Sequence, residues 1–320
     1  MSAPTSIFEI LTWAGDTLKP ANATRLVKQN PRLDAQVLLS YILNVNSAYL
    51  FTHGDEILSN ESLETFQRLI ARRARHEPVA YLTQTKAFYG RDFFVNNHVL
   101  IPRPDTETLI EAALAVINSR RANGDVSTII DIGTGSGAIA ITLALETHQP
   151  TVAIDIDPNV LHVAQHNAET LGASITFLEG SLFEPFEKGS GRLLYGFEIE
   201  NRTISDLTPS HLVITANLPY LTPWQWNDLD ADVKNYEPKL ALVGGADGLA
   251  LYDELCVQLR SYLHEQSRRG TRIAVDLFIE IDPSQRLTAP ALLKAHFPDS
   301  KILLINDMSH RERIVHCAIR

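Results

Sequence analysis

The chain has 320 residues, of which 45% are hydrophobic and 21% are charged, a composition typical of a globular protein long enough for two domains. Its 28 basic and 38 acidic residues give a net charge of −10, which disfavours a protein that binds nucleic acid through a basic face. It has no signal-peptide pattern, no apolar run near the roughly 20 residues that cross a bilayer, and only two cysteines, which together favour a cytoplasmic protein without disulfides or metal.

The first part of the chain, residues 1–85, is predicted to form a small helical domain. Asn30 followed by Pro31 is typical of a helix N-cap with proline in the first turn. The apolar residues that follow at helical spacing are Leu33, Val37, Leu38, Tyr41 and Ile42. A second helix is predicted to begin after Asn60 and to end before Pro78.

A change of pattern between residues 86 and 97 predicts a β-hairpin. Aromatic and β-branched residues flank Gly90 and Arg91, and the glycine suits a turn position that needs a positive φ. Residues 86–100 are therefore assigned to a linker between the two domains.

From about residue 126, short apolar strands alternate with helical segments. The strands are predicted at 128–132, 151–155, 175–179, 212–216, 272–278, 302–306 and 313–319, and the helices at 137–147, 158–171, 248–266 and 285–296. This order predicts a doubly wound, mostly parallel α/β sheet over residues 101–320, with a final antiparallel pair. The segment 188–210 has no clear period and is predicted to be an inserted surface loop.

The first predicted strand runs into the glycine loop Asp131-Ile132-Gly133-Thr134-Gly135-Ser136-Gly137, and a helix follows at once. Glycines allow a ligand to approach the backbone closely, and the N–H groups of the helix terminus point at it. Asp155, at the end of the next strand, has the spacing of an acidic residue that binds ribose hydroxyls. The pattern fits either a dinucleotide or S-adenosylmethionine, so it predicts a nucleoside-bearing cofactor without deciding which.

The strand predicted at 212–216 ends in Asn217-Leu218-Pro219-Tyr220. The side-chain oxygen of Asn217 and the backbone carbonyl of Leu218 can both accept hydrogen bonds from an NH₂ group, which holds its nitrogen in line with a methyl donor and stabilises developing charge. Tyr220 can pack against the plane of the acceptor. After the glycine loop and Asp155, this motif favours a nitrogen methyltransferase over a plain Asn turn beside a core tyrosine.

These two motifs resemble class I S-adenosylmethionine-dependent methyltransferases, whose sheet has seven strands. Three further blocks are similar to the glutamine methyltransferases of peptide chain release factors, the HemK/PrmC type. The blocks are Leu100–Glu107 (LIPRPDTE), Tyr236–Leu249 (with EP, AL and GGADGL) and Asp307–Arg313. The helical front part is similar to that family's N-terminal domain, so the resemblance covers nearly the whole chain apart from the 188–210 segment.

The resemblance implies an enzyme that moves the methyl group of S-adenosylmethionine to a side-chain amide nitrogen. The acceptor is the glutamine in the Gly-Gly-Gln loop of a class I release factor, whose remaining surface would contact the helical domain. The implied cofactor-binding residues are Asp131, Gly133, Thr134, Gly135, Ser136, Gly137, Asp155, Leu182 and Asn217. The implied substrate-binding residues are Asn217, Leu218, Pro219 and Tyr220, of which Asn217 and Tyr220 are catalytic. A monomer without a metal, a membrane or a stable nucleic acid partner is expected.

The sequence departs from the family pattern at several positions. Ser181 stands where many members have aspartate, and His310 takes the place of the last glycine in the terminal block. The usual E-I-G-x-x-Q stretch is represented by Gln285 with either Asp276 or Glu280, and the sequence does not choose between the two carboxylates.

A further departure, Leu218 in place of the first proline of the usual NPPY, leaves an alternative function open. NLPY also occurs in ribosomal RNA adenine N6-methyltransferases, so RNA methylation is the second prediction, and a non-catalytic scaffold that binds S-adenosylmethionine is the third. The net charge of −10 and the LIPRPDTE block weigh against RNA. The intact glycine loop, Asp155 and Asn217 weigh against a decayed scaffold, and a dehydrogenase would have no use for NLPY.

Overall fold

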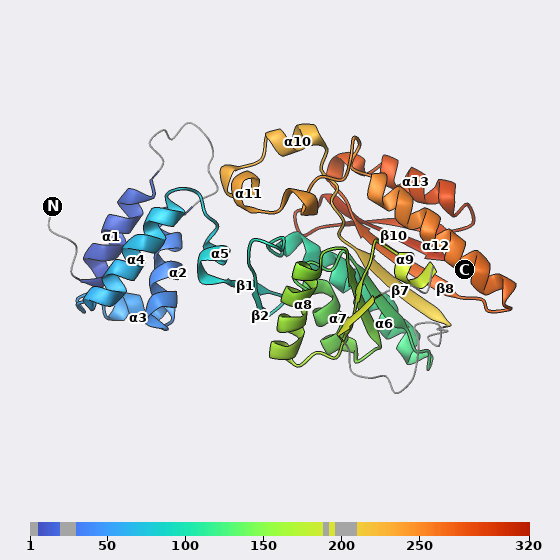
Figure 1. The fold of residues 1–320 in the computed structure, drawn as a ribbon, viewed down its shortest axis with the longest axis horizontal. Helices are drawn as coiled ribbons and strands as arrows, with labels where there is room; N and C mark the ends of the chain where they lie inside the picture. Colours follow the sequence, from blue (N-terminus) through green and yellow to red (C-terminus); the bar gives the residue numbers. More distant parts are fainter. Residues whose placement is uncertain (1–5, 20–29, 188–191, 196–209) are drawn as a thin grey trace. The chain divides into compact units, whose positions relative to one another are not determined.

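The computed structural model describes residues 6–19, 30–187, 192–195 and 210–320, which divide into two compact units (Figure 1). The first unit extends to Thr85 and also takes in Asp230–Tyr236, whereas the second contains Lys86–Leu229 and Glu237–Arg320. The sequence had assigned residues 230–236 to the second domain. Among the described helices, none has the length and apolar character that crossing a membrane requires.

The first unit is a bundle of short helices around one apolar core. Its helices are α1 (Ile7–Thr17), α2 (Pro31–Leu43), α3 (Ser47–Thr52), α4 (Asn60–Arg73) and α5 (Val79–Thr83). The short α11 (Ala231–Tyr236) belongs to the same unit but has no buried residue. The Asn30 side chain accepts the backbone N–H of Leu33 at 3.2 Å, which confirms the predicted cap of α2. Ile10, Leu38 and Phe66, from three different helices, are fully buried in the shared core.

The buried face of helix α2 overlaps only in part with the predicted one, since Leu38 is buried and Ile42 packs against the core. Its buried residues are Ala35, Leu38 and Leu39. Leu33, Val37 and Tyr41, predicted to lie on the apolar face, are 51%, 40% and 50% exposed. Residues at i, i+3 and i+4 share one side of a helix, so the small Ala35 marks the buried face, and large side chains alone point to the neighbouring one.

The predicted hairpin is present and, apart from Thr85, belongs to the second unit. Its strands are β1 (Thr85–Phe88) and β2 (Arg91–Phe94). The two turn residues are Tyr89 and Gly90, with φ of 48° and 71°, one position earlier than predicted. Two-residue hairpins favour a turn with both residues at positive φ because its twist matches that of the strands. Phe88 and Phe93 are buried in the core of the second unit, which anchors the hairpin there.

The second unit is built on one large sheet. Its strands are β3 (Thr128–Ile132), β4 (Thr151–Asp155), β5 (Thr176–Glu179), β6 (Arg192–Tyr195), β7 (His211–Ala216), β8 (Ala274–Glu280), β9 (Lys301–Asn306) and β10 (Glu312–Ile319), in the spatial order β6-β5-β4-β3-β7-β8-β10-β9. Strands β5, β4, β3, β7 and β8 are parallel, and β10 is antiparallel to both β8 and β9. The doubly wound, mostly parallel sheet is therefore confirmed, with eight strands where seven were predicted.

An eighth strand lies inside the segment that was predicted to be a loop. Residues Arg192–Tyr195 form β6, which pairs antiparallel with β5 at the sheet edge. An edge strand has a single neighbour and so need not show a strong apolar pattern. The remainder of the 188–210 segment, apart from Ser210, lies outside the described residues.

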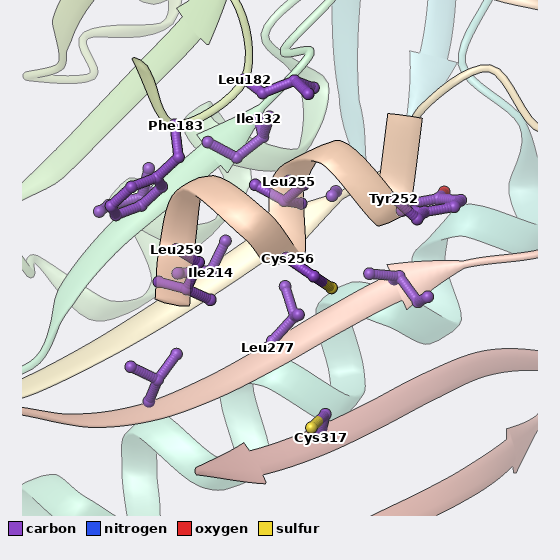
Figure 2. Packing of buried hydrophobic residues seen from close by; sticks show 14 of the residues in the cluster. Ile132, Leu182, Phe183, Ile214, Tyr252, Leu255, Cys256, Leu259, Leu277 and Cys317 are labelled. Atoms are coloured by element: carbon purple, nitrogen blue, oxygen red, sulfur yellow. The ribbon is translucent and has the colours of Figure 1, made fainter. Parts of the chain in front are cut away.

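Helices cover both faces of the sheet. They are α6 (Glu107–Ala122), α7 (Ala138–Thr147), α8 (Pro158–Leu171), α9 (Glu184–Glu187), α12 (Ala250–Arg268) and α13 (Thr288–His296), whereas the short α10 (Pro223–Asn227) has no buried residue. Because successive strand residues face opposite sides, Ile129 joins the core under α6, α7 and α8, whereas Ile130 joins the core under α12 and α13. Figure 2 shows Cys256 of α12 and Cys317 of β10 in this second core, both buried free thiols as predicted.

A buried carboxylate ties three strands together at the start of β8. Asp276 is fully buried and accepts hydrogen bonds from His211 of β7 at 2.8 Å, His316 of β10 at 2.7 Å, and Arg320 at 3.0 Å. Burial alone would raise the pKa of Asp276, but these hydrogen bonds outweigh it and hold the pKa well below its usual range. The ionised form therefore stabilises the fold above the unfolded-state pKa of about 3.9, and this contribution is lost only as the pH falls below it.

Replacing Asp276 by asparagine should lower the free energy of unfolding at pH 7 by about 3–5 kcal/mol, because Arg320 loses a buried carboxylate partner and two histidines lose a hydrogen-bond acceptor. Asp253→Asn is a matched control, since Asp253 also pairs with a histidine, at 2.6 Å, but its side chain is 56% exposed. The control should cost less than about 1 kcal/mol. Urea unfolding followed by circular dichroism measures both values, and equal costs would contradict this account of Asp276.

Candidate active site

A cavity of about 290 Å³ lies at the carboxyl ends of β3, β4, β5 and β7. The segments that directly follow these strands line it: 133–136, 155–157, 180–182 and 217–219. Parallel strands bring their carboxyl ends to one edge of the sheet, which is why segments so far apart in sequence meet here. The predicted site residues in the lining are Gly133, Thr134, Gly135, Ser136, Asp155, Leu182, Asn217, Leu218 and Pro219.

Asp131, which was predicted to bind the cofactor, does not line the cavity. It is fully buried, and its two carboxylate oxygens accept hydrogen bonds from the hydroxyls of Thr134 and Thr215, each at 2.7 Å. Burial raises the pKa of Asp131 to about 6, although the two hydroxyls hold part of the rise back. The Asp131 carboxylate therefore links the glycine loop, through Thr134, to strand β7, through Thr215.

The glycines of the loop serve different purposes. Gly135 donates its N–H to a carboxylate oxygen of Asp155 at 3.1 Å, and a side chain at Gly135 would meet only open space. A Cβ at Gly133 would lie 2.8 Å from Cδ2 of Leu218, so this glycine makes room for the residue that replaces the family's proline. Gly137 does not line the cavity; a Cβ there would lie 3.2 Å from Ala164 of α8, so it permits close helix packing.

Asn217 is held from behind by two side chains. Its Nδ2 donates to Oγ1 of Thr106 at 3.1 Å and to Oε2 of Glu280 at 3.0 Å. Thr106 also donates to Glu280 at 2.7 Å, and the Tyr220 hydroxyl donates to the other oxygen of Glu280 at 3.1 Å. Tyr220 itself does not line the cavity; burial and the charge of Glu280 raise the pKa of its phenol. Tyr220 thus holds Glu280 in place beside Asn217.

The backbone that follows Asn217 packs closely against two glycines of the GGADGL block. A Cβ at Gly244 would lie 1.8 Å from the carbonyl oxygen of Pro219, and one at Gly248 would lie 1.9 Å from that of Tyr220. The Gln285 side chain donates to the same Tyr220 carbonyl at 3.0 Å. The block therefore fixes the shape of the motif from the side away from the cavity.

The comparisons with known proteins agree with this architecture. Residues 9–83 match the PrmC N-terminal domain and residues 124–192 match a methyltransferase domain. The release factor glutamine methyltransferase of Bacillus cereus is 34% identical over 97% of this chain and 98% of that protein. The chain belongs to the release factor glutamine methyltransferase family. Its relative of the same name from Geobacter sulfurreducens is 38% identical over 74% of each chain.

Among solved structures, the ribosomal protein L11 methylase of Lactobacillus delbrueckii subsp. bulgaricus is similar to this methyltransferase. The match has a TM-score of 0.40 and 17% identity, and it covers 71% of this chain and 83% of that one.

The sequence blocks that carried the resemblance converge on the site of this methyltransferase. Arg103 pairs with the buried carboxylate of Glu237, which also accepts the N–H of Ile101 at 3.2 Å. Asp105 lies 3.4 Å from a guanidinium nitrogen of Arg313 in the terminal block. A buried carboxylate left unpaired would be strongly destabilising, so these ion pairs hold the blocks in one arrangement.

Two departures from the family pattern are accommodated locally. His310 adopts φ of 60°, the conformation that glycine favours, in a turn where Asp307 accepts the N–H groups of Ser309 and Arg311 at 2.8 and 3.0 Å. Ser181 lines the cavity, beside Leu182.

The structure also decides which carboxylate takes part in the site. Glu280 ends β8 beside Asn217, and Gln285 contacts the Tyr220 carbonyl, whereas Asp276 lies near the opposite end of the same strand. Thr106 was not singled out from the sequence, although its place in LIPRPDTE was a signal. Among the described residues, no group of three or more His, Cys, Asp or Glu is arranged to hold a metal ion.

Gly248→Ala should impair methyl transfer without touching the substrate, because the new Cβ would collide with the Tyr220 carbonyl and shift the motif. Misplacement by about 1 Å can cost roughly 10²-fold in turnover, so we expect a loss of that size with cofactor affinity little changed. Gly270→Ala is the matched control, since Gly270 has φ of 82° against 72° at Gly248 but open space around it.

Both variants should lose about 1–2 kcal/mol of stability, the cost of a left-handed alanine, and Gly248→Ala should lose more because its Cβ also collides with backbone. Only Gly248→Ala should lose turnover. Steady-state kinetics and thermal unfolding separate the two effects. Equal kinetic losses in both variants would show that backbone strain, rather than collision with the motif, is responsible.

Proposed function

We propose that this methyltransferase transfers the methyl group of S-adenosylmethionine to the side-chain amide nitrogen of a release factor glutamine, the one in the Gly-Gly-Gln loop. The observation that carries the proposal is a single cavity lined both by the glycine loop with Asp155 and by Asn217–Pro219. A nucleoside-bearing cofactor and a planar amide would meet there. Membership of the family supports the choice of acceptor.

The residues present fit S-adenosylmethionine. Gly135 leaves open space where a side chain would stand, and its neighbours in the loop line the cavity. Asp155 accepts the N–H groups of Gly135 and Asp157, at 3.1 and 3.2 Å, one on each oxygen. Because an ionised carboxylate has about four acceptor positions, Asp155 keeps capacity for ribose hydroxyls. When bound, the cofactor supplies an activated methyl group.

The chain's own contribution is to hold and polarise the acceptor amide. The lone pair of an amide nitrogen is delocalised into its carbonyl group, so the nitrogen is a weak nucleophile, and positive charge develops on it as the new C–N bond forms. We propose that Oδ1 of Asn217 and the backbone carbonyl of Leu218 accept its two N–H groups and stabilise that charge. Once the new C–N bond has formed, the nitrogen releases one proton to water, which requires no strong base from the protein.

The helical unit is proposed to contact the rest of the release factor. Leu33, Val37 and Tyr41 form an exposed apolar stripe at i, i+4 and i+8 on α2, which suits a protein partner. A net charge of −10 supports the expectation that no nucleic acid is bound stably. Action as a monomer remains a prediction.

A methyl-transfer assay with labelled S-adenosylmethionine tests the proposed reaction. The substrates to compare are a release factor, its Gly-Gly-Ala variant and ribosomal RNA. Label on the wild-type factor alone is the expected result, because only this substrate carries the amide. Label on RNA alone would replace this proposal with adenine methylation, and label on both forms of the factor would move the acceptor to another residue.

Asn217→Ala should lower turnover by roughly 10²–10³, the usual loss for one hydrogen-bonding group at a centre of developing charge. Cofactor affinity, measured by calorimetry, should change far less. Asn123→Ala serves as the control, since Asn123 is exposed and follows helix α6. Near-normal turnover of the Asn217 variant on the release factor would refute the proposed acceptor role.

A further inference from the structure

The amide of an asparagine has two chemically opposite ends. Its oxygen accepts hydrogen bonds and its NH₂ group donates them, yet the two ends have nearly the same size and shape. An Asn217 turned by 180° about its last bond would present NH₂ to the acceptor amide, donor against donor. The proposed chemistry therefore depends on which end of Asn217 faces the protein.

The carboxylate of Glu280 decides this orientation. An ionised carboxylate only accepts hydrogen bonds, so the Asn217 atom 3.0 Å from its Oε2 must be the nitrogen. The reversed amide would place Oδ1 against a carboxylate oxygen, with repulsion in place of a hydrogen bond. Thr106 adds to the preference, because its hydroxyl hydrogen goes to Glu280 at 2.7 Å and its oxygen is left to accept from Asn217 at 3.1 Å.

We propose that Glu280 is a positioning residue for methyl transfer: it fixes the amide of Asn217 with the oxygen free to accept from the substrate amide. This inference rests on the proposed function, because it assigns Glu280 a purpose within that reaction. Glu280 contacts Asn217 and not the substrate, so its effect reaches the acceptor only through the asparagine.

The surroundings of Glu280 keep its oxygens available as acceptors. The Tyr220 hydroxyl donates to Oε1 at 3.1 Å, and the positive charge of Arg313 acts on the carboxylate. Burial raises the pKa of Glu280, but the Thr106 hydrogen bond and Arg313 hold part of the rise back; Asp105 adds to it. The hydroxyls and the guanidinium thus favour the ionised form, which only accepts hydrogen bonds, in opposition to burial.

The same residue also fixes the second proposed acceptor. The backbone carbonyl of Glu280 accepts the hydroxyl of Tyr252, and the Tyr252 oxygen accepts the N–H of Leu218 at 3.2 Å. The Leu218 peptide, whose carbonyl is proposed to bind the substrate, is therefore tied through Tyr252 to the end of β8. Both acceptors depend on Glu280, one on its side chain and the other on its backbone.

An exchange of chemical groups between the two positions tests the proposal. In Asn217→Asp, two carboxylates face each other, and we expect turnover at pH 8 to fall by about 10². It should recover partly as the pH is lowered, because the pair then binds one shared proton. Adding Glu280→Gln supplies an NH₂ donor from the other side, so the double variant should regain at least about tenfold at pH 8 and lose the pH dependence.

Glu280→Gln alone should lower turnover roughly two- to tenfold, less than loss of the acceptor, since the new glutamine can present either end to Asn217. The KM for the release factor and the affinity for S-adenosylmethionine should stay near wild-type values. Asp276→Asn is the matched control, a buried carboxylate on the same strand outside the site, and should alter stability without altering turnover. If Glu280 only stabilised the fold, the double variant would not regain turnover and Asn217→Asp would show no new pH dependence. That outcome would overturn the proposal.

A readout without substrate keeps this inference separate from the proposed function. The side-chain NH₂ of Asn217, assigned in NMR spectra by its loss in Asn217→Asp, should exchange with solvent at least about tenfold faster in Glu280→Gln, where its hydrogen bond to a carboxylate is lost. Unchanged exchange would overturn the proposal whatever the enzyme methylates. Faster exchange in a protein that does not methylate the release factor would leave the orientation established and the proposed substrate refuted.

Discussion

The backbone of Asn217–Tyr220 has to keep a defined shape beyond the last hydrogen-bonded residue of β7, and the rest of the site depends on this constraint. A loop with ordinary side chains around it would be free to settle in several conformations. Here the loop is pressed against Gly244 and Gly248, whose missing side chains leave room for its carbonyl groups. Rigidity therefore comes from close backbone contact, and a leucine at 218 can stand where proline would otherwise restrict the chain.

The convergence of distant segments explains why the motif blocks are so widely separated in sequence. Three residues of LIPRPDTE have different partners: Arg103 pairs with Glu237, Asp105 with Arg313, and Thr106 with Glu280. In each pair, a charged or polar group of one block has its ion-pair or hydrogen-bond partner in another block. A block that changed alone would leave a buried polar group without its partner, which costs more than the interaction itself contributes.

The sequence predicted the parts of the molecule that depend on local pattern. Strands β3 and β4 match their predicted bounds residue for residue, because buried parallel strands are short apolar runs with clear ends. The glycine loop and Asn217 were found because their chemistry is visible in the residue types. The contacts that depend on tertiary packing were not predicted. Asp131 and Gly137 have the residue types of ligand contacts, and only packing shows that one supports the loop and the other admits a helix.

The two-part division of the chain has a consequence for how the protein is made. The helical unit is completed by Asp230–Tyr236, and the Tyr236 hydroxyl donates to the Arg75 carbonyl at 2.8 Å within it. The chain therefore leaves this unit after Thr85 and returns to it about 145 residues later. On a ribosome that adds about 5–20 residues per second, the unit would wait several seconds or more for its last helix. A fragment cut at the first boundary would be a helical unit with one helix missing.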